Sequence, residues 1–453
     1  MSEMNITITH TPNKLERFPT LQIPQTILKK LSIPSDQPIS LNIAGDQQKI
    51  TCCSTSSKSS QISMDQQLAN ALGIPDESRV KIGYTQQTQQ LKIGPVLAIL
   101  VSTISKNNPP YGKLNKFFQE VIVYARSRHI LAYVISVEQL LKGERNVTGW
   151  TFYKNKWCEI TCPYPHVVYN RIGTRRVERS NQFTDLKEKL SHRQVQLFNA
   201  TFLNKWEVYE KLSDRKLQNH LPKTQVFGPL ALKTFVEQYP AVFVKPVNGS
   251  LGNGIYRINR TPFGFASHYT TKNGQIFKQF NKLSQLYNYL SRRVNPKRYI
   301  VQQGIPLIQI QGRTIDFRAL MQKNGSGKWS TTSMVARVGP ANRFVSNIAR
   351  GGEICRVTKA LRYCGFKDPK TLRSKLLHVA KKSCEAIEDQ YNNQFGELGV
   401  DLGVSRSGHV YLLEINSKPS KTDDTVPSST AKGRPSVHRL LDYTQYLMNH
   451  SAK

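Results

Sequence analysis

The sequence predicts an α/β (α+β) protein of several domains, on three observations. The N-terminal part contains a diverged internal repeat of short helices and alternating strands. From Gly94 onward, apolar strands alternate with an amphipathic helix. Near the C-terminus, a long helix precedes a hairpin that carries acidic residues. A length of 453 residues, at roughly 150 residues per domain, fits three domains, which we expect at residues 1–92, 93–190 and 191–453.

The internal repeat accounts for most of the first expected domain. The segment LQIPQTILKKLSIPSDQPISLNI, which starts at Leu21, aligns with ISMDQQLANALGIPDESRVKIGY, which starts at Ile62. Each copy reads as a short helix, an Ile-Pro turn and a strand of period two. The matching positions are apolar, so the repeat indicates packing rather than chemistry. Two such copies resemble a double-psi β-barrel.

The next segment predicts a β-α-β unit. The apolar strand Pro95–Ser102 is followed by a helix with an apolar face over Lys113–Arg128 and then by the strand ILAYVIS. A further strand, Val167–Tyr169, leads into the basic segment RIGTRRVER. That segment either faces a ligand or forms a charged loop, and both readings stay open.

Charge, hydropathy and cysteine content restrict the partners. The chain has 64 Lys and Arg against 30 Asp and Glu, a net charge of +34, which attracts nucleic acid, an acidic matrix or a phosphorylated substrate. The basic residues are dispersed rather than gathered in one stripe, which makes nucleic acid a weak candidate. No apolar run reaches the ~20 residues of a membrane span, and no signal peptide is recognisable, so a soluble protein made in the cytoplasm is expected. The seven cysteines show no CxxC spacing and are expected to be mostly free thiols without a zinc site.

The hairpin GVDLGVSRSGHVYLLEINSKP is a candidate metal site. Its second strand alternates so that Leu412, Glu414 and Asn416 share one face, and folding back brings Asp401 opposite that end. Oxygen donors of this kind suit a magnesium ion that also holds substrate phosphates. The alternative is a structural one, with one carboxylate paired with a lysine and the other solvated. A charge in a strand as apolar as YLLEIN is costly to bury unpaired, which favours the metal.

A strand that ends in a lysine precedes a glycine-rich loop in AVFVKPVNGSLGNGI. Lys245 offers a compact cation to phosphate oxygens, while Gly249, Gly252 and Gly254 let backbone amides approach them. Because the lysine precedes the glycines, the segment is not a Walker A loop, and it does not match GxGxxG. Taken alone, such a segment is more often an ordinary turn.

Two further segments carry polar groups on strands. In YIVQQGIPLIQIQGRTIDFRALM, the strand that ends at Gly304 offers backbone groups for an adenine edge. Asp316 and Arg318 then share a strand face at a spacing suited to ribose or phosphate, or form a structural Asp-Arg pair. In MVARVGPANRFVSNIARGGE, Arg337 and Asn347 combine a guanidinium and an amide with flexible backbone.

In their order along the chain, these segments resemble the ATP-grasp superfamily from Asn204 onward. The series is a lysine strand, a glycine loop, a hinge strand, Asp-x-Arg, Arg, Ser-Asn-x-x-x-Gly-Gly, Gly-Val-Asp and Glu-x-Asn-x-x-Pro. The DFR, SNIARGG, GVD and LLEINSKP segments are similar to those of amino-acid ligases that add glutamate to proteins or small molecules. With the N-terminal repeat, IVQQGIPL and GRTIDFRALMQKN, the layout resembles the endospore coat-associated ATP-grasp proteins of spore-forming bacteria. This implies a C-terminal ATP-grasp fold, preceded by a pre-ATP-grasp-like α/β domain and the barrel.

The resemblance also implies roles for the matching positions. Nucleotide binding is implied for Lys205, Lys245, Gly249, Gly252, Gly254, Gln303, Gly304, Ile305, Asp316 and Asn347. Binding of one or two magnesium ions is implied for Asp401, Glu414 and Asn416. Steadying of the transferred phosphoryl group or of an acyl phosphate is implied for Arg318 and Arg337. Many family members have an acidic residue after the hinge glutamine, where this chain has Gln302-Gln303-Gly304, so the side-chain contact to adenine is left open.

The implied activity is that of an ATP- and magnesium-dependent ligase, which activates a carboxylate as an acyl phosphate for attack by an amine. A kinase would use the same site. The alternatives are a spore-coat scaffold that binds nucleotide with little or no turnover, and a nucleic-acid binder. Small-molecule or peptide carboxylates and amines are the expected substrates, and anionic spore-coat components are candidate partners. The spore coat is a candidate destination after synthesis in the cytoplasm.

Overall fold

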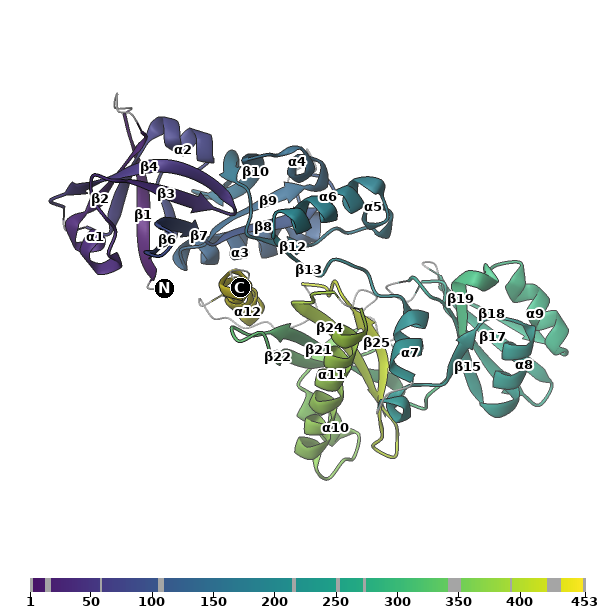
Figure 1. Cartoon of the computed structure of the whole chain (residues 1–453). Helices are drawn as coiled ribbons and strands as arrows, with labels where there is room; N and C mark the ends of the chain where they lie inside the picture. The colour runs from purple at the N-terminus through teal and green to yellow at the C-terminus, as the bar shows by residue number, and fades with distance from the viewer. Residues whose placement is uncertain are drawn as a thin grey trace.

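The computed structural model describes residues 3–12, 18–57, 59–104, 110–213, 217–249, 253–271, 274–340, 352–391, 393–421 and 433–450. These residues form a mixed α/β architecture of one closed barrel and three open sheets. The four units follow one another along the elongated molecule, with the barrel at one end and the sheet of residues 224–303 at the other (Figure 1).

The barrel contains both copies of the repeat. Its strands are β1 (Glu3–Thr11), β2 (Thr20–Pro24), β3 (Pro38–Ile43), β4 (Asp46–Thr55), β5 (Gln61–Asp65), β6 (Ser78–Thr85) and β7 (Gln90–Gly94), in the order β1-β5-β2-β4-β3-β7-β6. The helices α1 (Gln25–Leu31) and α2 (Gln66–Leu72) occupy matching places in the two copies. Each helix ends at a residue in the left-handed conformation, Ser32 and Gly73, and the following isoleucine donates its N–H to the last turn at 2.9 Å. Each copy therefore has the expected helix, turn and strand, while the double-psi class of the barrel stays a prediction.

The second sheet has the order β11-β10-β9-β8-β12-β13. Its strands are β8 (Val96–Val101), β9 (Leu131–Ser136), β10 (Asn146–Tyr153), β11 (Lys156–Pro163), β12 (Val167–Asn170) and β13 (Gln196–Phe198). Its helices are η1 (Gly112–Leu114), α3 (Asn115–Ser127), α4 (Val137–Lys142), α5 (Arg175–Glu178) and α6 (Asn181–His192). Strand β8 lies parallel to both β9 and β12, so β8, α3 and β9 form the expected β-α-β unit.

The third sheet is antiparallel, in the order β14-β19-β15-β16-β17-β18. It consists of β14 (Thr224–Val226), β15 (Ala241–Pro246), β16 (Tyr256–Thr261), β17 (Gly264–Thr271), β18 (Gly274–Phe280) and β19 (Tyr299–Gln303). The helices α8 (Pro229–Gln238) and α9 (Leu283–Ser291) pack on it around Leu232, Val242 and Leu286. Two short helices, η2 (Gln218–His220) and η3 (Pro296–Arg298), lie before β14 and β19.

The fourth sheet carries the predicted metal hairpin. Its strands are β20 (Gln309–Ile310), β21 (Arg313–Lys323), β22 (Trp329–Val338), β23 (Glu353–Cys355), β24 (Glu397–Val404) and β25 (Val410–Asn416), with the order β23-β22-β21-β24-β25 and β20 beside β21. Its helices are α7 (Lys205–Ser213), α10 (Val357–Tyr363) and α11 (Pro369–Tyr391). Phe317, Ala319 and Val400 form a core with residues of α11 such as Leu376 and Ala380. One sheet face is thus closed by helices, which leaves the opposite face for polar side chains.

The hydrophobic cores do not correspond one to one with the sheets. A single core extends from Ile6 in β1 through Val96 and Ile135 to Val195, and so joins the barrel to one face of the second sheet. On the other face, Phe118 of α3 packs with Leu441 of the C-terminal helix α12 (Pro435–His450). The last helix of the chain therefore contributes to the core of the second sheet.

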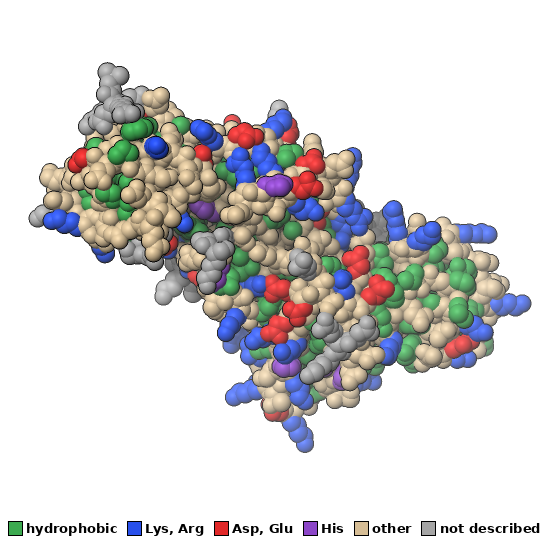
Figure 2. Space-filling model, in the orientation of Figure 1, with side chains coloured by type: hydrophobic (Ala, Val, Ile, Leu, Met, Phe, Trp, Pro, Cys, Tyr) green, Lys and Arg blue, Asp and Glu red, His purple; other side chains and the backbone are tan. Residues whose placement is uncertain are grey.

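The cysteines are free thiols, as expected from the sequence. All seven cysteines are free, and Cys52, Cys162 and Cys384 are buried. Within the described ranges, no helix is long and apolar enough to cross a membrane. Figure 2 shows Lys and Arg side chains scattered over the visible face rather than aligned in one stripe.

Candidate active site

The open face of the fourth sheet gathers the polar residues that the sequence analysis selected. Asp316 is the cross-strand partner of Arg337, and Arg318 is the partner of Asp401. Asp401 is in turn the partner of Glu414 on β25. Because cross-strand partners project from the same side of a sheet, these side chains form one polar face across four strands.

A buried ion network occupies the centre of that face. Arg318 binds Asp401 through two nitrogens, of which Nη2 lies 2.9 Å from Oδ2. Arg337 donates to both oxygens of Asp316, at 2.6 and 2.7 Å, and lies 3.0 Å from Asp401. All four residues are at most 8% exposed. Burial disfavours the charged forms, but the paired charges outweigh it, so the pKa of Asp401 falls below its usual value and that of Arg337 rises above its own.

Two lysines face the edge of this network. Lys205, the first residue of α7, places its Nζ 3.0 Å from Glu414 Oε1 and donates to the Gly249 carbonyl at 2.7 Å. Lys245 lies at the end of β15. Burial, together with the positive charge of Lys205, lowers the pKa of Lys245 to about 8, against the opposing effect of Glu414. Lys245, Glu414 and Lys205 are therefore close enough for their charges to interact.

These groups line a small cavity between the third and fourth sheets. Its walls are Lys205, Val208, Tyr209, Leu221, Pro222, Lys245, Gln302, Leu412, Leu413, Glu414 and Ile415. Apolar side chains from α7 and β25 thus surround two lysines and one carboxylate. Such a mixture of apolar walls and a few convergent polar groups is typical of a small-molecule site.

The hinge strand contributes Gln302 to the cavity, whereas Gln303, Gly304 and Ile305 are not among its lining residues. The N–H of Gln303 donates to the Lys223 carbonyl, and its side-chain oxygen accepts from the Lys223 N–H. The N–H of Gly304 donates to the Ala241 carbonyl at 2.9 Å. A Cβ at Gly304 would lie 2.6 Å from that carbonyl oxygen, so the glycine is required for close packing. Adenine recognition by these residues stays a prediction.

The glycine loop is described only in part. A Cβ at Gly249 would lie 2.7 Å from the Pro246 ring, and Gly254 has φ +72° and packs against Tyr299. Packing at Gly249 and backbone conformation at Gly254 thus favour glycine at these positions, whether or not a ligand binds there. Gly252 and Asn347, for which nucleotide binding was predicted, lie outside the described residues.

A β-bulge in the hairpin corrects one expectation. The pairing passes from Asp401 opposite Glu414 to Leu402 opposite Leu412, so one extra residue, Leu413, is inserted. Leu402 and Leu412 belong to the core beneath the sheet. Strict alternation had predicted that Leu412 and Glu414 share one face of the strand. The bulge makes this prediction wrong, because it places Leu412 on the opposite face from Glu414.

The predicted metal donors are close in register but paired with cations. Asp401 is held by two arginines, and Glu414 by Lys205. Asn416 follows on β25, opposite Gly399. Among the described residues, no three His, Cys, Asp or Glu side chains gather at one point, so a trio here depends on the Asn416 amide as its third donor.

Sequence reasoning missed a second buried cluster, centred on Glu397. This carboxylate is 1% exposed and contacts Arg171 at 3.1 Å, Lys421 at 2.5 Å, Gln322 at 3.2 Å and the Tyr169 hydroxyl. Burial opposes its ionisation, but Lys421 and Arg171 outweigh burial and lower the pKa of Glu397. The sequence signal was an acidic residue at the start of the apolar run ELGVDLGV.

The cluster also fixes the chain after β25. Arg171 donates to the Pro419 carbonyl at 3.1 Å, and Asn199 donates to the carbonyls of Glu397 and Ser417 at 2.7 and 2.5 Å. Lys418 binds Glu178 and the Ile172 carbonyl. The basic segment that begins at Arg171 thus holds the hairpin in place.

A lysine strand, a hinge strand and a carboxylate hairpin surround one cavity between two sheets, the arrangement that the resemblance to the ATP-grasp class implies. The chain belongs to the YheC/D-like ATP-grasp family, whose model matches residues 194–447.

Two relatives cover much of the chain. The endospore coat-associated protein YheD of Bacillus subtilis (strain 168) is 28% identical over 397 residues, 85% of this chain and 85% of that protein. The endospore coat-associated protein YheC of the same strain is 22% identical over 268 residues, 58% of this chain and 73% of that protein. Among solved structures, D-cycloserine synthetase DcsG aligns with a TM-score of 0.47 and 13% identity, over 79% of this chain and 99% of that chain.

Proposed function

We propose that the chain is an ATP- and magnesium-dependent ligase that joins a carboxylate to an amine through an acyl phosphate. The observation that carries the proposal is the convergence of Lys205, Lys245 and Glu414 on one cavity beside the buried network of Asp401. Cations at the cavity suit the phosphates of a nucleotide, and the adjacent carboxylates suit its metal ion.

The residues present fit a magnesium ion. Asp401, Glu414 and Asn416 supply two carboxylates and one amide from neighbouring strands, and magnesium prefers such oxygen donors together with phosphate and water. When bound, the ion would neutralise charge on the transferring phosphoryl group. Lys205, which holds Glu414 in this structure, would then be released toward the phosphates.

The remaining polar residues are assigned by charge and position. Lys205 and Lys245 bind the phosphates, and Asp316 helps to hold the nucleotide. Arg318 and Arg337 steady the transferred phosphoryl group, in orientations that Asp316 and Asp401 already fix. A substrate carboxylate oxygen attacks the γ-phosphorus and ADP leaves. An amine then attacks the acyl carbon, and inorganic phosphate leaves with the electron pair of the broken C–O bond.

Hydroxylamine provides a test that does not require the natural amine. With ATP, magnesium and pooled amino acids or peptides as carboxylates, hydroxylamine should capture the acyl phosphate as a hydroxamate, with ADP and phosphate released in equal amounts. A kinase would instead yield a stable phosphorylated product. If the chain binds nucleotide but forms neither product, the ligase proposal is contradicted, and a scaffold that binds nucleotide without turnover is the remaining hypothesis.

A coat-associated role is the second candidate, because both curated relatives are described as endospore coat-associated. The charge distribution supports an anionic partner, since the sequence from Gln238 to Ile315 contains eleven Lys and Arg but no Asp or Glu. Binding to acidic coat material that disappears at high salt would support this role.

The low pKa of Lys245 predicts a pH dependence of nucleotide affinity. Lys245 must be protonated to bind phosphate, and in the free chain it loses its proton as the pH rises through about 8. Affinity should therefore be constant below that pH and fall by up to about tenfold per pH unit above it. Lys245→Arg stays protonated and should abolish the decline. Titration of a fluorescent ATP analogue across this range, with Lys233→Arg on α8 as the control variant, measures the effect.

A further inference from the structure

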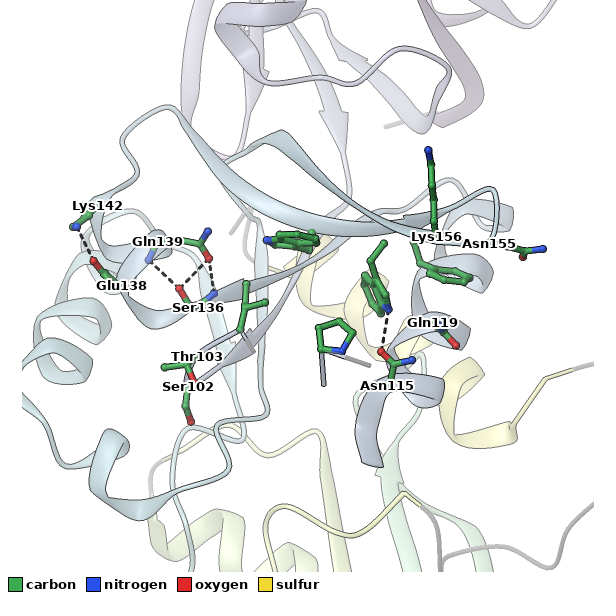
Figure 3. A pocket seen from close by; sticks show the side chains of 15 residues that line it. Ser102, Thr103, Asn115, Gln119, Ser136, Glu138, Gln139, Lys142, Asn155 and Lys156 are labelled. Atoms are coloured by element: carbon green, nitrogen blue, oxygen red, sulfur yellow. Dashed lines mark hydrogen bonds and ion pairs between the residues drawn. The ribbon is translucent and has the colours of Figure 1, made fainter. Parts of the chain in front are cut away.

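A second cavity, of about 910 Å³, lies in the sheet that follows the barrel. Its walls are Ser102, Thr103, Ile104, Pro110, Asn115, Gln119, Ser136, Glu138, Gln139, Lys142, Trp150, Phe152, Asn155, Lys156 and Trp157 (Figure 3). None of these residues lines the cavity at Lys205 and Lys245. Its volume falls within the range of small-molecule pockets, roughly 300–1,000 Å³.

The position of this cavity in the fold is one that commonly binds ligands. Ser102 and Thr103 directly follow β8, and Ser136 is the last residue of the parallel strand β9. The cavity therefore lies at the carboxyl ends of two neighbouring parallel strands, beside the β10–β11 hairpin. In open α/β sheets, ligands commonly bind outside the carboxyl ends of the strands.

One wall is aromatic and fixed in orientation. The Trp157 indole N–H donates to Asn115 Oδ1 at 3.0 Å. The ring meets Tyr111 and Phe152 edge to face, at centroid distances of 4.6 and 5.4 Å. With its N–H already bonded, Trp157 presents apolar ring surface to the cavity. Trp150 and Phe152, both half-buried on β10, extend this surface.

Most of the polar groups of the cavity are uncharged. Ser102, Thr103 and Gln119 make no side-chain hydrogen bond within the described part of the chain. Ser136 and Gln139 bond each other at the start of α4. Glu138 is paired with Lys142 at 2.7 Å, and both side chains are largely exposed. Lys156 is exposed at the end of the β10–β11 hairpin. In a chain of net charge +34, this interior is therefore close to neutral.

We propose that this cavity binds an uncharged saccharide. A sugar ring offers C–H faces that bury against flat aromatic surface, and a rim of hydroxyls that pairs with hydroxyl and amide side chains. A nucleotide or an acidic peptide would meet only one cation without an ion pair among the described lining residues, the exposed Lys156, since Lys142 is paired with Glu138. The site goes beyond the proposed ligase activity, because it shares no residue with the nucleotide cavity.

Tryptophan emission of the full-length chain provides the assay, since two of its four tryptophans line the cavity. The probes are cellobiose and N,N′-diacetylchitobiose as neutral sugars, glucuronate and glucosamine as charged ones, and a leucine dipeptide. At least one neutral sugar should produce a saturable change below ~10 mM. Trp150→Ala should weaken its binding by about tenfold or more, while Trp150→Phe, which keeps a ring face, should bind within about threefold of the natural chain.

Two controls separate binding from folding. Thr103→Ala removes an exposed hydroxyl from the rim and should also weaken binding, without a change in melting temperature. Phe263→Ala removes an aromatic side chain that is 85% exposed on the third sheet and should change nothing. The proposal is overturned if no neutral sugar saturates, if Trp150→Ala binds as the natural chain does, or if a charged sugar or the dipeptide binds more tightly than every neutral sugar.

Discussion

Glu414→Gln should reduce magnesium-dependent ATP turnover by about a hundredfold or more while the chain stays folded. Glu414 is the more accessible of the two predicted metal carboxylates, with 26% of its side chain exposed, and it is paired only with Lys205 among the ion pairs of the described residues. Glutamine keeps the shape and one oxygen but removes the negative charge. Lys205 would retain its bond to the Gly249 carbonyl, so little loss of stability is expected.

Glu385→Gln provides the matched control. Glu385 lies on α11 and pairs with Lys382 at 2.9 Å, away from the cavity. Turnover with ATP, magnesium and hydroxylamine, and the melting temperature, should be measured for both variants. The metal assignment is wrong if Glu414→Gln turns over like the control, or if its lost activity follows from unfolding.

Glu397→Gln should lower the free energy of unfolding by about 3–5 kcal/mol, because it removes the buried negative charge that both Arg171 and Lys421 contact. An amide can accept only one of their hydrogen bonds well, and its NH₂ group would oppose the donors around it. Urea denaturation at neutral pH measures the effect. Glu188→Gln, an exposed position on α6, should change the free energy by no more than about 0.5 kcal/mol.

The pH dependence of that loss has a defined sign. The folded pKa of Glu397 is lowered, so the ionised carboxylate stabilises the chain above its ordinary pKa. This contribution disappears as the pH falls through the lowered value. The difference between the natural chain and Glu397→Gln should therefore be constant near neutral pH and shrink in acid. A difference that does not depend on pH would mean that packing, rather than charge, accounts for the loss.

The sequence was informative where the pattern is local. The β-α-β unit around α3, the long helix α11 and the strands of the hairpin occur where periodicity predicted them. The bulge at Leu413 was not predictable, because strict alternation is the default for a strand and only the pairing register shows the inserted residue. Its effect is to separate Leu412 from Glu414.

The ion pairs show a second limit of sequence reasoning. Asp316 and Arg318 were considered as a pair because they are two positions apart on one strand. In the structure Asp316 binds Arg337, and Arg318 binds Asp401. Directly opposite residues on neighbouring strands have Cβ atoms about 5 Å apart, closer than residues i and i+2 of one strand. Local spacing identified the residues but not their partners, which lie on other strands.

The basic segment that begins at Arg171 was left open between ligand binding and a charged loop. It does neither at Arg171, which is buried against Glu397 and the Pro419 carbonyl. Arg175 donates to the Leu203 carbonyl at 2.6 Å. These partners lie far away in sequence, so only the fold brings them together.

The core shared by the barrel and the second sheet makes the N-terminal half cooperative. Since the buried side chains from Ile6 to Val195 pack as one cluster, the barrel is not a detachable module at the end of the chain. Removing it would uncover part of one face of the second sheet, which also carries the aromatic cavity. A partner bound to the barrel and a ligand bound in that cavity would consequently act on the same unfolding equilibrium. Binding at either place would stabilise both the barrel and the second sheet against unfolding.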